Sequence, residues 1–144
     1  LFLAESRPVS VHTVGLPNLG KYKDDNVIIT IKFEDGSIAT IDYLANGDKS
    51  VEKESLEIFS GGRVIQLLDY RKLILVTHGK RSIFHSRLRQ DKGHSIAWNE
   101  FINSIENKKQ SPIPFEDLFI SSLTTFAARE SYLSKNEIFL NDFI

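Results

Sequence analysis

The stretch DNVIITIKFEDGSIATIDYLANG, residues 25–47, decides the fold of this chain. It holds two runs rich in apolar and β-branched residues on either side of the pair Asp35-Gly36. An Asp-Gly pair between two such runs is a strong signal for a β-hairpin, because both central residues of the tight turn need positive φ. The sequence therefore predicts two antiparallel strands joined at Asp35-Gly36.

A two-residue turn at this pair sets the cross-strand register. The predicted pairs are Phe33 with Ile38, Ile31 with Thr40, Ile29 with Asp42 and Val27 with Leu44. The other side of the hairpin then carries Ile28, Thr30, Ala39, Ile41 and Tyr43. Neither side is polar throughout. In a sheet with one solvated face, each strand normally alternates apolar residues on the inner face with polar residues on the outer face. Ile28, Ile41 and Tyr43 are therefore candidate interface residues that another subunit covers.

Further segments rich in β-branched and aromatic residues are separated mostly by short connections. The predicted strands are 9–14, 55–60, 63–68, 71–78 and 81–88, with a short edge strand within 137–143. The pair Gly61-Gly62 predicts a tight turn that places Phe59 opposite Val64 and Ile58 opposite Ile65. A turn at Gly79-Lys80 would place Val76 opposite Ile83 and Leu75 opposite Phe84. About six or seven strands joined in this way predict an antiparallel meander rather than a doubly wound parallel sheet.

The apolar period lengthens after Gln90, which indicates helices. An amphipathic helix is predicted over 96–105, with Asp91 as its N-cap, and a second over 115–134, where small residues permit close packing. We therefore expect an α+β fold. It would comprise an open, mainly antiparallel (mixed) sheet of about six or seven strands, with two or more helices on one face and the other face available for association.

Composition disfavours several classes of function. The chain has 144 residues, 41% of them hydrophobic, which is enough for one domain with its own core. Lys and Arg total 18 and Asp and Glu total 19, so no net charge attracts nucleic acid or an anionic membrane. The absence of cysteine excludes disulfides and thiolate chemistry and is compatible with a cytoplasmic location. Methionine is absent even at position 1, so we expect a fragment of a longer protein.

No complete catalytic or metal site is apparent in the sequence. None of the spacings of common metal motifs occurs among the four histidines, which are His12, His78, His85 and His94. Neither a phosphate-binding glycine motif nor a nucleophile elbow is present. We therefore expect no catalytic residue, no metal ligand and no cofactor bound by this chain alone.

The segment Asp91-Lys92-Gly93-His94 is the one candidate substrate-binding site. It precedes a predicted helix, whose first backbone N–H groups can meet an anionic or hydroxylated ligand. His94 and Lys92 are the candidate substrate-binding residues. Helix capping by Asp91, with Gly93 easing the turn, is the alternative explanation of the same residues.

The order and spacing of several motifs carry a family resemblance over residues 8–138. The motifs are Arg7-Pro8-Val9-Ser10-Val11, Asp25-Asn26-Val27, FEDGSIATI at 33–41, LEIFSGG at 56–62, Asp91-Lys92-Gly93-His94, EFINSI at 100–105 and Ser111-Pro112-Ile113. Together they resemble the C-terminal half of glucose-fructose oxidoreductase and inositol dehydrogenase relatives. The DKGH variant is most similar to the branch in which this module follows a zinc-type alcohol dehydrogenase-like region.

The resemblance implies a function and a set of partners. In such enzymes an N-terminal Rossmann domain binds NAD or NADP, and a C-terminal α/β domain shapes the substrate pocket and mediates subunit association. Residues 1–144 would then be a single domain, the substrate and oligomerisation domain of a longer oxidoreductase, without its Rossmann domain.

The implied parent enzyme acts on a sugar, cyclitol or nucleotide-sugar-like substrate with NAD or NADP, and this part is inactive by itself. The implied partners are the Rossmann domain of the parent and a second copy that associates through the open sheet face as a homodimer or higher oligomer. The alternative is a self-associating or carbohydrate-binding β-module with no catalytic role.

Overall fold

The computed structural model describes residues 1–17, 24–86 and 90–143, which contain eight strands and two α-helices. They divide into two compact units, a first unit of Leu1–Asn46 with Gln110–Ile144 and a second unit of Gly47–Lys109. The α+β class and the antiparallel pairing expected from the sequence are confirmed. The single-domain organisation stays a prediction.

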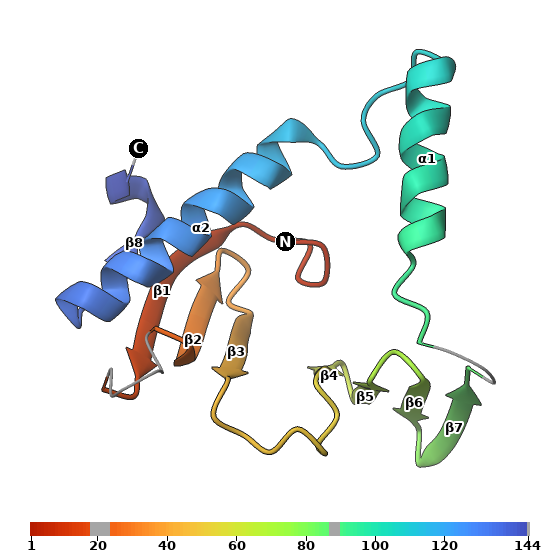
Figure 1. The fold of residues 1–144 in the computed structure, drawn as a ribbon, viewed down its shortest axis with the longest axis horizontal. Coiled ribbons are helices and arrows are strands. Elements are labelled where there is room, and N and C mark those ends of the chain that lie inside the picture. The colour runs from red at the N-terminus through yellow and green to blue at the C-terminus, as the bar shows by residue number, and fades with distance from the viewer. Residues whose placement is uncertain (18–23, 87–89, 144) are drawn as a thin grey trace. The chain divides into compact units, whose positions relative to one another are not determined.

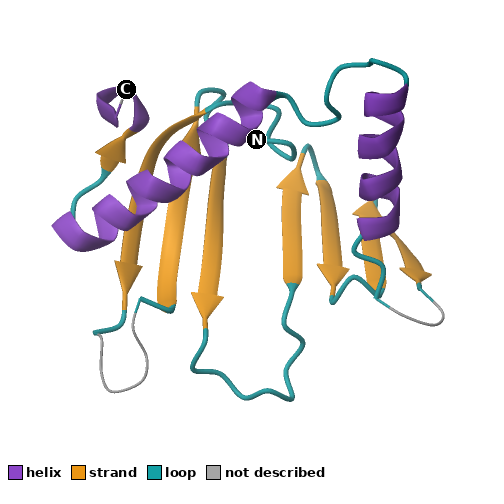
Figure 2. Ribbon diagram, turned by 45° about the horizontal axis from the view of Figure 1, so that its top comes forward, coloured by secondary structure: helices purple, strands orange, loops and turns teal. Residues whose placement is uncertain are grey.

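The first unit is a four-stranded antiparallel sheet with a long helix across it (Figures 1 and 2). The strands are β1 (Pro8–Gly15), β2 (Asn26–Phe33), β3 (Ile38–Leu44) and β8 (Ile138–Phe139), in the spatial order β3-β2-β1-β8. Helix α2 (Phe115–Ser134) has the predicted bounds and packs chiefly on β1, and the 3-10 helix η1 (Leu140–Phe143) follows β8. The core comprises Val11, Ile31, Phe33, Ala127, Ala128 and Leu140.

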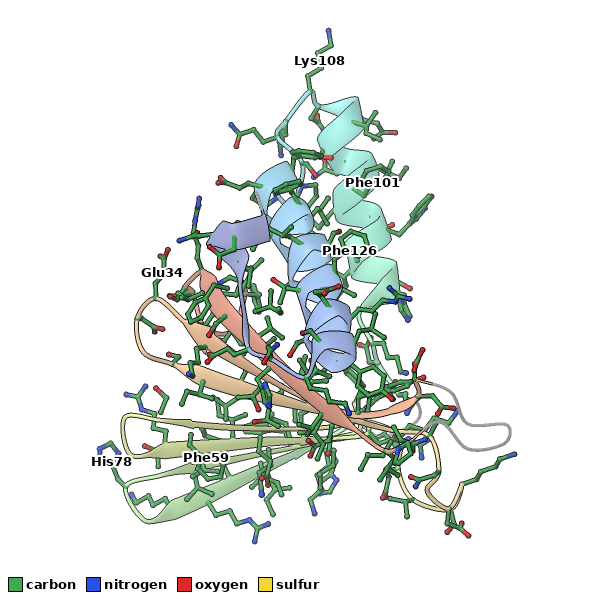
Figure 3. The ribbon with its side chains drawn as sticks, turned by 90° about the vertical axis from the view of Figure 1, so that its left-hand side faces the viewer. Glu34, Phe59, His78, Phe101, Lys108 and Phe126 are labelled. Atoms are coloured by element: carbon green, nitrogen blue, oxygen red, sulfur yellow. The ribbon has the colours of Figure 1, made fainter. Side chains whose placement is uncertain are left out.

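The register of the β2–β3 hairpin differs from the prediction by one residue. The observed pairs are Lys32 with Ile38, Ile31 with Ala39, Ile29 with Ile41 and Val27 with Tyr43. The turn is the cause, because the Phe33 N–H donates to the Ser37 carbonyl and closes a three-residue loop that has Gly36 at φ +86°. Such a loop is the next most common hairpin connection after the two-residue turn. Figure 3 shows Glu34 at this tip.

A shift of one residue moves a side chain to the opposite face of a sheet. Ile41 and Tyr43 lie on the face that carries the core and α2, in the same alternating set as Ile31, and Ile28 lies on the other face. The prediction that Ile28, Ile41 and Tyr43 share one face is therefore wrong. All three side chains are exposed, and their role at an interface stays a prediction.

The second unit is a four-stranded antiparallel meander followed by a helix. Its strands are β4 (Ser55–Ser60), β5 (Arg63–Leu68), β6 (Lys72–Thr77) and β7 (Lys80–His85), and its helix is α1 (His94–Glu106). The predicted Gly61-Gly62 turn is confirmed, with both residues at positive φ and Phe59 opposite Val64. The sequence predicted one sheet, whereas the described strands form two, because β3 and β4 are joined by the largely exposed loop 45–54 and not by a tight turn.

The β6–β7 hairpin turns one residue earlier than predicted. Its central residues are His78 at φ 48° and Gly79 at φ 71°, and Thr77 pairs with Lys80. The predicted partners are each shifted by two residues, so the observed pairs are Val76 with Arg81, Leu75 with Ser82, Ile74 with Ile83 and Leu73 with Phe84. A shift of two residues keeps every side chain on its predicted face. The predicted end of this strand, Leu88, lies outside the described residues.

Both faces of the second sheet carry apolar side chains. Cross-strand pairing puts Leu56, Ile58, Ile65, Leu67, Leu73, Leu75 and Phe84 on one face. The other face carries Phe59, Val64, Ile74, Val76 and Ile83. Within the described part of this unit Ile74 is the one fully buried apolar residue, while Phe59 is 72% exposed. An antiparallel sheet that is apolar on both faces is typical of one that needs a covering layer on each side.

Candidate functional site

A polar cluster at one end of the second sheet contains part of the predicted site. We call it the strand-end cluster, and its members are Glu54, Asp69, Tyr70, Arg71, Gln90 and Lys92. Glu54 immediately precedes β4, residues 69–71 join β5 to β6, and residues 90–93 lead into α1. The antiparallel meander brings these segments to the same edge, because β4 and β6 begin where β5 and β7 end.

The β5–β6 turn within this cluster is strained. Asp69 and Tyr70 both adopt left-handed backbone conformations, at φ 50° and 51°, and the Arg71 N–H donates to the Leu68 carbonyl at 2.9 Å. A residue other than glycine in this left-handed conformation costs about 1–2 kcal/mol. Aspartate tolerates the conformation better than tyrosine does. Surrounding bonds hold the turn in place, since the Asp69 N–H donates to the Glu54 carbonyl at 2.7 Å.

The carboxylate of Asp69 links two further members of the cluster. It accepts one hydrogen bond from Gln90 Nε2 and forms an ion pair with Arg71 Nε at 3.3 Å. Its side chain is only 15% exposed, so solvent screens these contacts less than it would at an open surface. Asp69 therefore ties the segment before α1 to the edge of the sheet.

Lys92 is held in the cluster by a carboxylate and an aromatic ring. Its Nζ donates to Glu54 Oε1 at 2.5 Å and lies 5.6 Å from the centroid of the Tyr70 ring. The hydrogen bond to Glu54, together with the negative charges of Glu54 and Asp69, raises the pKa of Lys92 above its ordinary value, while partial desolvation opposes this. Lys92 is therefore a cation at neutral pH that is already paired with Glu54, and its role toward a substrate stays a prediction.

His94 lies outside these interactions. It is the first residue of α1, its side chain is exposed, and it makes no hydrogen bond or ion pair within the described ranges. The predicted N-cap, Asp91, is wrong, because the N-cap is Gly93 at φ 72°. Asp91 Oδ1 instead accepts the Gly93 N–H at 2.9 Å and closes a turn just before the helix. The structure thus separates the two predicted site residues, and only Lys92 joins the cluster.

The cluster offers donors and acceptors to a polar ligand. Glu54 Oε2 is shielded from solvent and has no hydrogen-bond partner within the described part of the chain, so it can accept one bond from a hydroxyl group. The described residues contain no group of three or more His, Cys, Asp or Glu side chains placed to hold a metal ion. The chemistry available here is binding of hydroxyl and charged groups.

Several solved structures that are similar to this chain are described as NAD-binding oxidoreductases or as dehydrogenases in complex with NADH. An oxidoreductase from Agrobacterium radiobacter in complex with NAD+, L-tartaric acid and magnesium has a TM-score of 0.76 at 12% identity, over 96% of this chain and 45% of that chain. An NAD-binding oxidoreductase from Klebsiella pneumoniae has a TM-score of 0.77 at 11% identity, over 93% and 46%. Levoglucosan dehydrogenase in complex with NADH and levoglucosan has a TM-score of 0.76 at 16% identity, over 92% and 45%.

The chain has the fold that its resemblance to glucose-fructose oxidoreductase and inositol dehydrogenase relatives implies. It spans less than half the length of each of these oxidoreductases. No family model and no curated protein matches the sequence. Neither helix in the described ranges is both long and apolar enough to cross a membrane.

The sequence did not predict most of the strand-end cluster. Glu54, Asp69, Tyr70 and Gln90 are far apart in the chain and belong to no motif with a known chemical role. The one available signal was the pattern of short connections, which predicted a meander and therefore a common edge for alternate strand ends.

Proposed function

We propose that this chain is the pocket-forming and association domain of an NAD- or NADP-dependent oxidoreductase that acts on a sugar, cyclitol or nucleotide-sugar-like substrate. A separate Rossmann domain of the parent would bind the nucleotide and supply the groups that transfer protons. This domain would supply one wall of the substrate pocket and hold two subunits together.

One observation carries the proposal. More than nine-tenths of the chain superimposes on less than half of several nicotinamide-dependent oxidoreductases, one of them bound to the sugar derivative levoglucosan. The order of the sequence motifs points in the same direction. The strand-end cluster favours a role in binding and not in catalysis. Its cation, Lys92, is already paired with Glu54 and has a raised pKa, which makes it a poor proton donor.

The coding sequence upstream of Leu1 provides a direct test. A G-x-G-x-x-G motif after a strand and a Glu-Lys-Pro triplet are expected there, since the first binds the pyrophosphate at a helix N-terminus. Calorimetric titration of the present chain with NAD and NADP should show no binding. Micromolar affinity for either nucleotide would overturn the proposal. An upstream sequence that lacks either motif would also overturn it.

A self-associating β-module without a catalytic partner is the second candidate. The apolar faces of the second sheet favour association, and Phe59 and Phe84 are exposed aromatic residues of the kind that stack on sugars. Titration with mono- and oligosaccharides separates the candidates. Millimolar or tighter sugar binding by this chain, lost in Phe59→Ala or Phe84→Ala, would favour the β-module.

A further inference from the structure

A groove of about 300 Å³ opens in the first unit between α2 and the strands β2 and β3. Its floor is apolar and comprises Val27, Ile29, Ile31 and Ile41. The side formed by α2 presents Thr124, Thr125, Ala128, Arg129, Tyr132 and Leu133. A concave, mainly apolar site of this volume, with a few polar groups, has the character of a small-molecule site.

One of the polar groups is the buried hydroxyl group of Thr13. Thr13 lines the groove, is 4% exposed, and pairs with Ile29 on the face that carries α2. Its N–H donates to Ser131 Oγ at 2.9 Å, yet its own Oγ1 has no hydrogen-bond partner among the residues described. Buried hydroxyl groups in folded proteins are normally paired, so an oxygen atom of a ligand in the groove would satisfy this one.

The second polar group is the guanidinium group of Arg129. Arg129 lines the same groove and makes no hydrogen bond or ion pair within the described ranges. The other charged lining residue, Asp24, already has an interaction of its own, and the Tyr132 hydroxyl donates to the Leu16 carbonyl at 3.2 Å. The guanidinium group is therefore available to an anion, and it binds carboxylates in a planar, bidentate geometry.

We propose that this groove binds a medium-chain aliphatic carboxylate. The alkyl chain lies on Val27, Ile29 and Ile41, and the carboxylate accepts hydrogen bonds from Arg129 and from Thr13 Oγ1. A sugar does not suit this site, because its hydroxyl groups would face an apolar floor without partners.

Calorimetric titration of the intact chain with octanoate tests the proposal. Saturable one-site binding is expected, and affinity should rise about fourfold for each methylene added from butyrate to octanoate. Thr13→Val and Arg129→Gln should each weaken octanoate binding about tenfold or more, whereas Thr13→Ser, which keeps the hydroxyl, should retain it. Octylamine should bind more weakly than octanoate.

The control variant is Arg63→Gln, which removes an exposed cation of β5 from the other unit and should leave the affinity unchanged. Circular dichroism of each variant establishes that it is folded. Absence of octanoate binding would overturn the proposal and leave the groove as a packing surface for another polypeptide segment. Binding that depends on chain length but is equal in all variants would also overturn it, because it would reflect adventitious hydrophobic contact only.

Discussion

Gly15 illustrates how a residue without a side chain sets the distance between a helix and a sheet. An added Cβ at this position would lie 2.8 Å from Tyr132 Cε2, 2.9 Å from the Asn26 carbonyl oxygen and 2.9 Å from Val27 Cγ1. We predict that Gly15→Ala lowers the free energy of unfolding by about 1–3 kcal/mol, because backbone and ring atoms must move. Urea denaturation measures this, and Gly47→Ala, whose Cβ meets nothing within 4 Å, is the matched control.

Glu137 joins three segments of the first unit through one oxygen atom. Its Oε1 accepts hydrogen bonds from Ser10 Oγ at 2.6 Å and from Lys32 Nζ at 2.9 Å. These bonds, Ser10 first, hold the pKa of Glu137 below its ordinary value of 4.5. The ionised form therefore stabilises the fold above that value, and the stabilisation is lost as pH falls through the lowered pKa.

We predict that Glu137→Gln is less stable than the native chain at pH 7, and that the difference shrinks progressively below about pH 4.5. Urea denaturation across this pH range measures the effect. Glu106→Gln removes the same charge from an exposed position at the end of α1 and is the matched control. A difference between Glu137→Gln and the native chain that stays constant with pH would contradict the prediction.

At the scale of elements, the tight turns decide the strand registers. His78 and Gly79 both have positive φ, which is costly for histidine and favourable for Asn-Gly. We predict that His78→Asn raises the free energy of unfolding by about 0.5 kcal/mol, while His78→Val lowers it by about 1 kcal/mol. Chemical denaturation of the two variants checks both directions. Equal stability of the two would show that backbone conformation at this turn does not limit the hairpin.

At the scale of the whole molecule, substitutions of Ile28 and Ile41 test which face of the first sheet mediates self-association. Ile28 lies on the face of the first sheet opposite α2, and Ile41 lines the groove beside α2. We predict that the chain self-associates through the face that carries Ile28. Ile28→Lys should weaken this association at least tenfold, which is about 1.4 kcal/mol, whereas Ile41→Lys should leave it intact. Light scattering at several concentrations gives the oligomeric state. A native chain that stays monomeric at high concentration would refute this prediction.

The sequence alone predicted those elements whose information is local. The bounds of α2, the strands β4 and β5 and the Gly61-Gly62 turn all match, because a helical period or a pair of glycines specifies its own conformation. The order of the sequence motifs also led to the fold, which solved structures at 11–16% identity share.

The tertiary structure decided the rest. One extra residue in the Glu34–Gly36 loop set which face of the sheet Ile41 occupies, and Asp-Gly pairs are compatible with loops of either length. Contacts between distant segments brought Lys92 to Glu54 and the backbone N–H of Thr13 to Ser131 of α2. Such contacts depend on chain segments that meet only in the folded state, so their geometry is absent from any local pattern of residues.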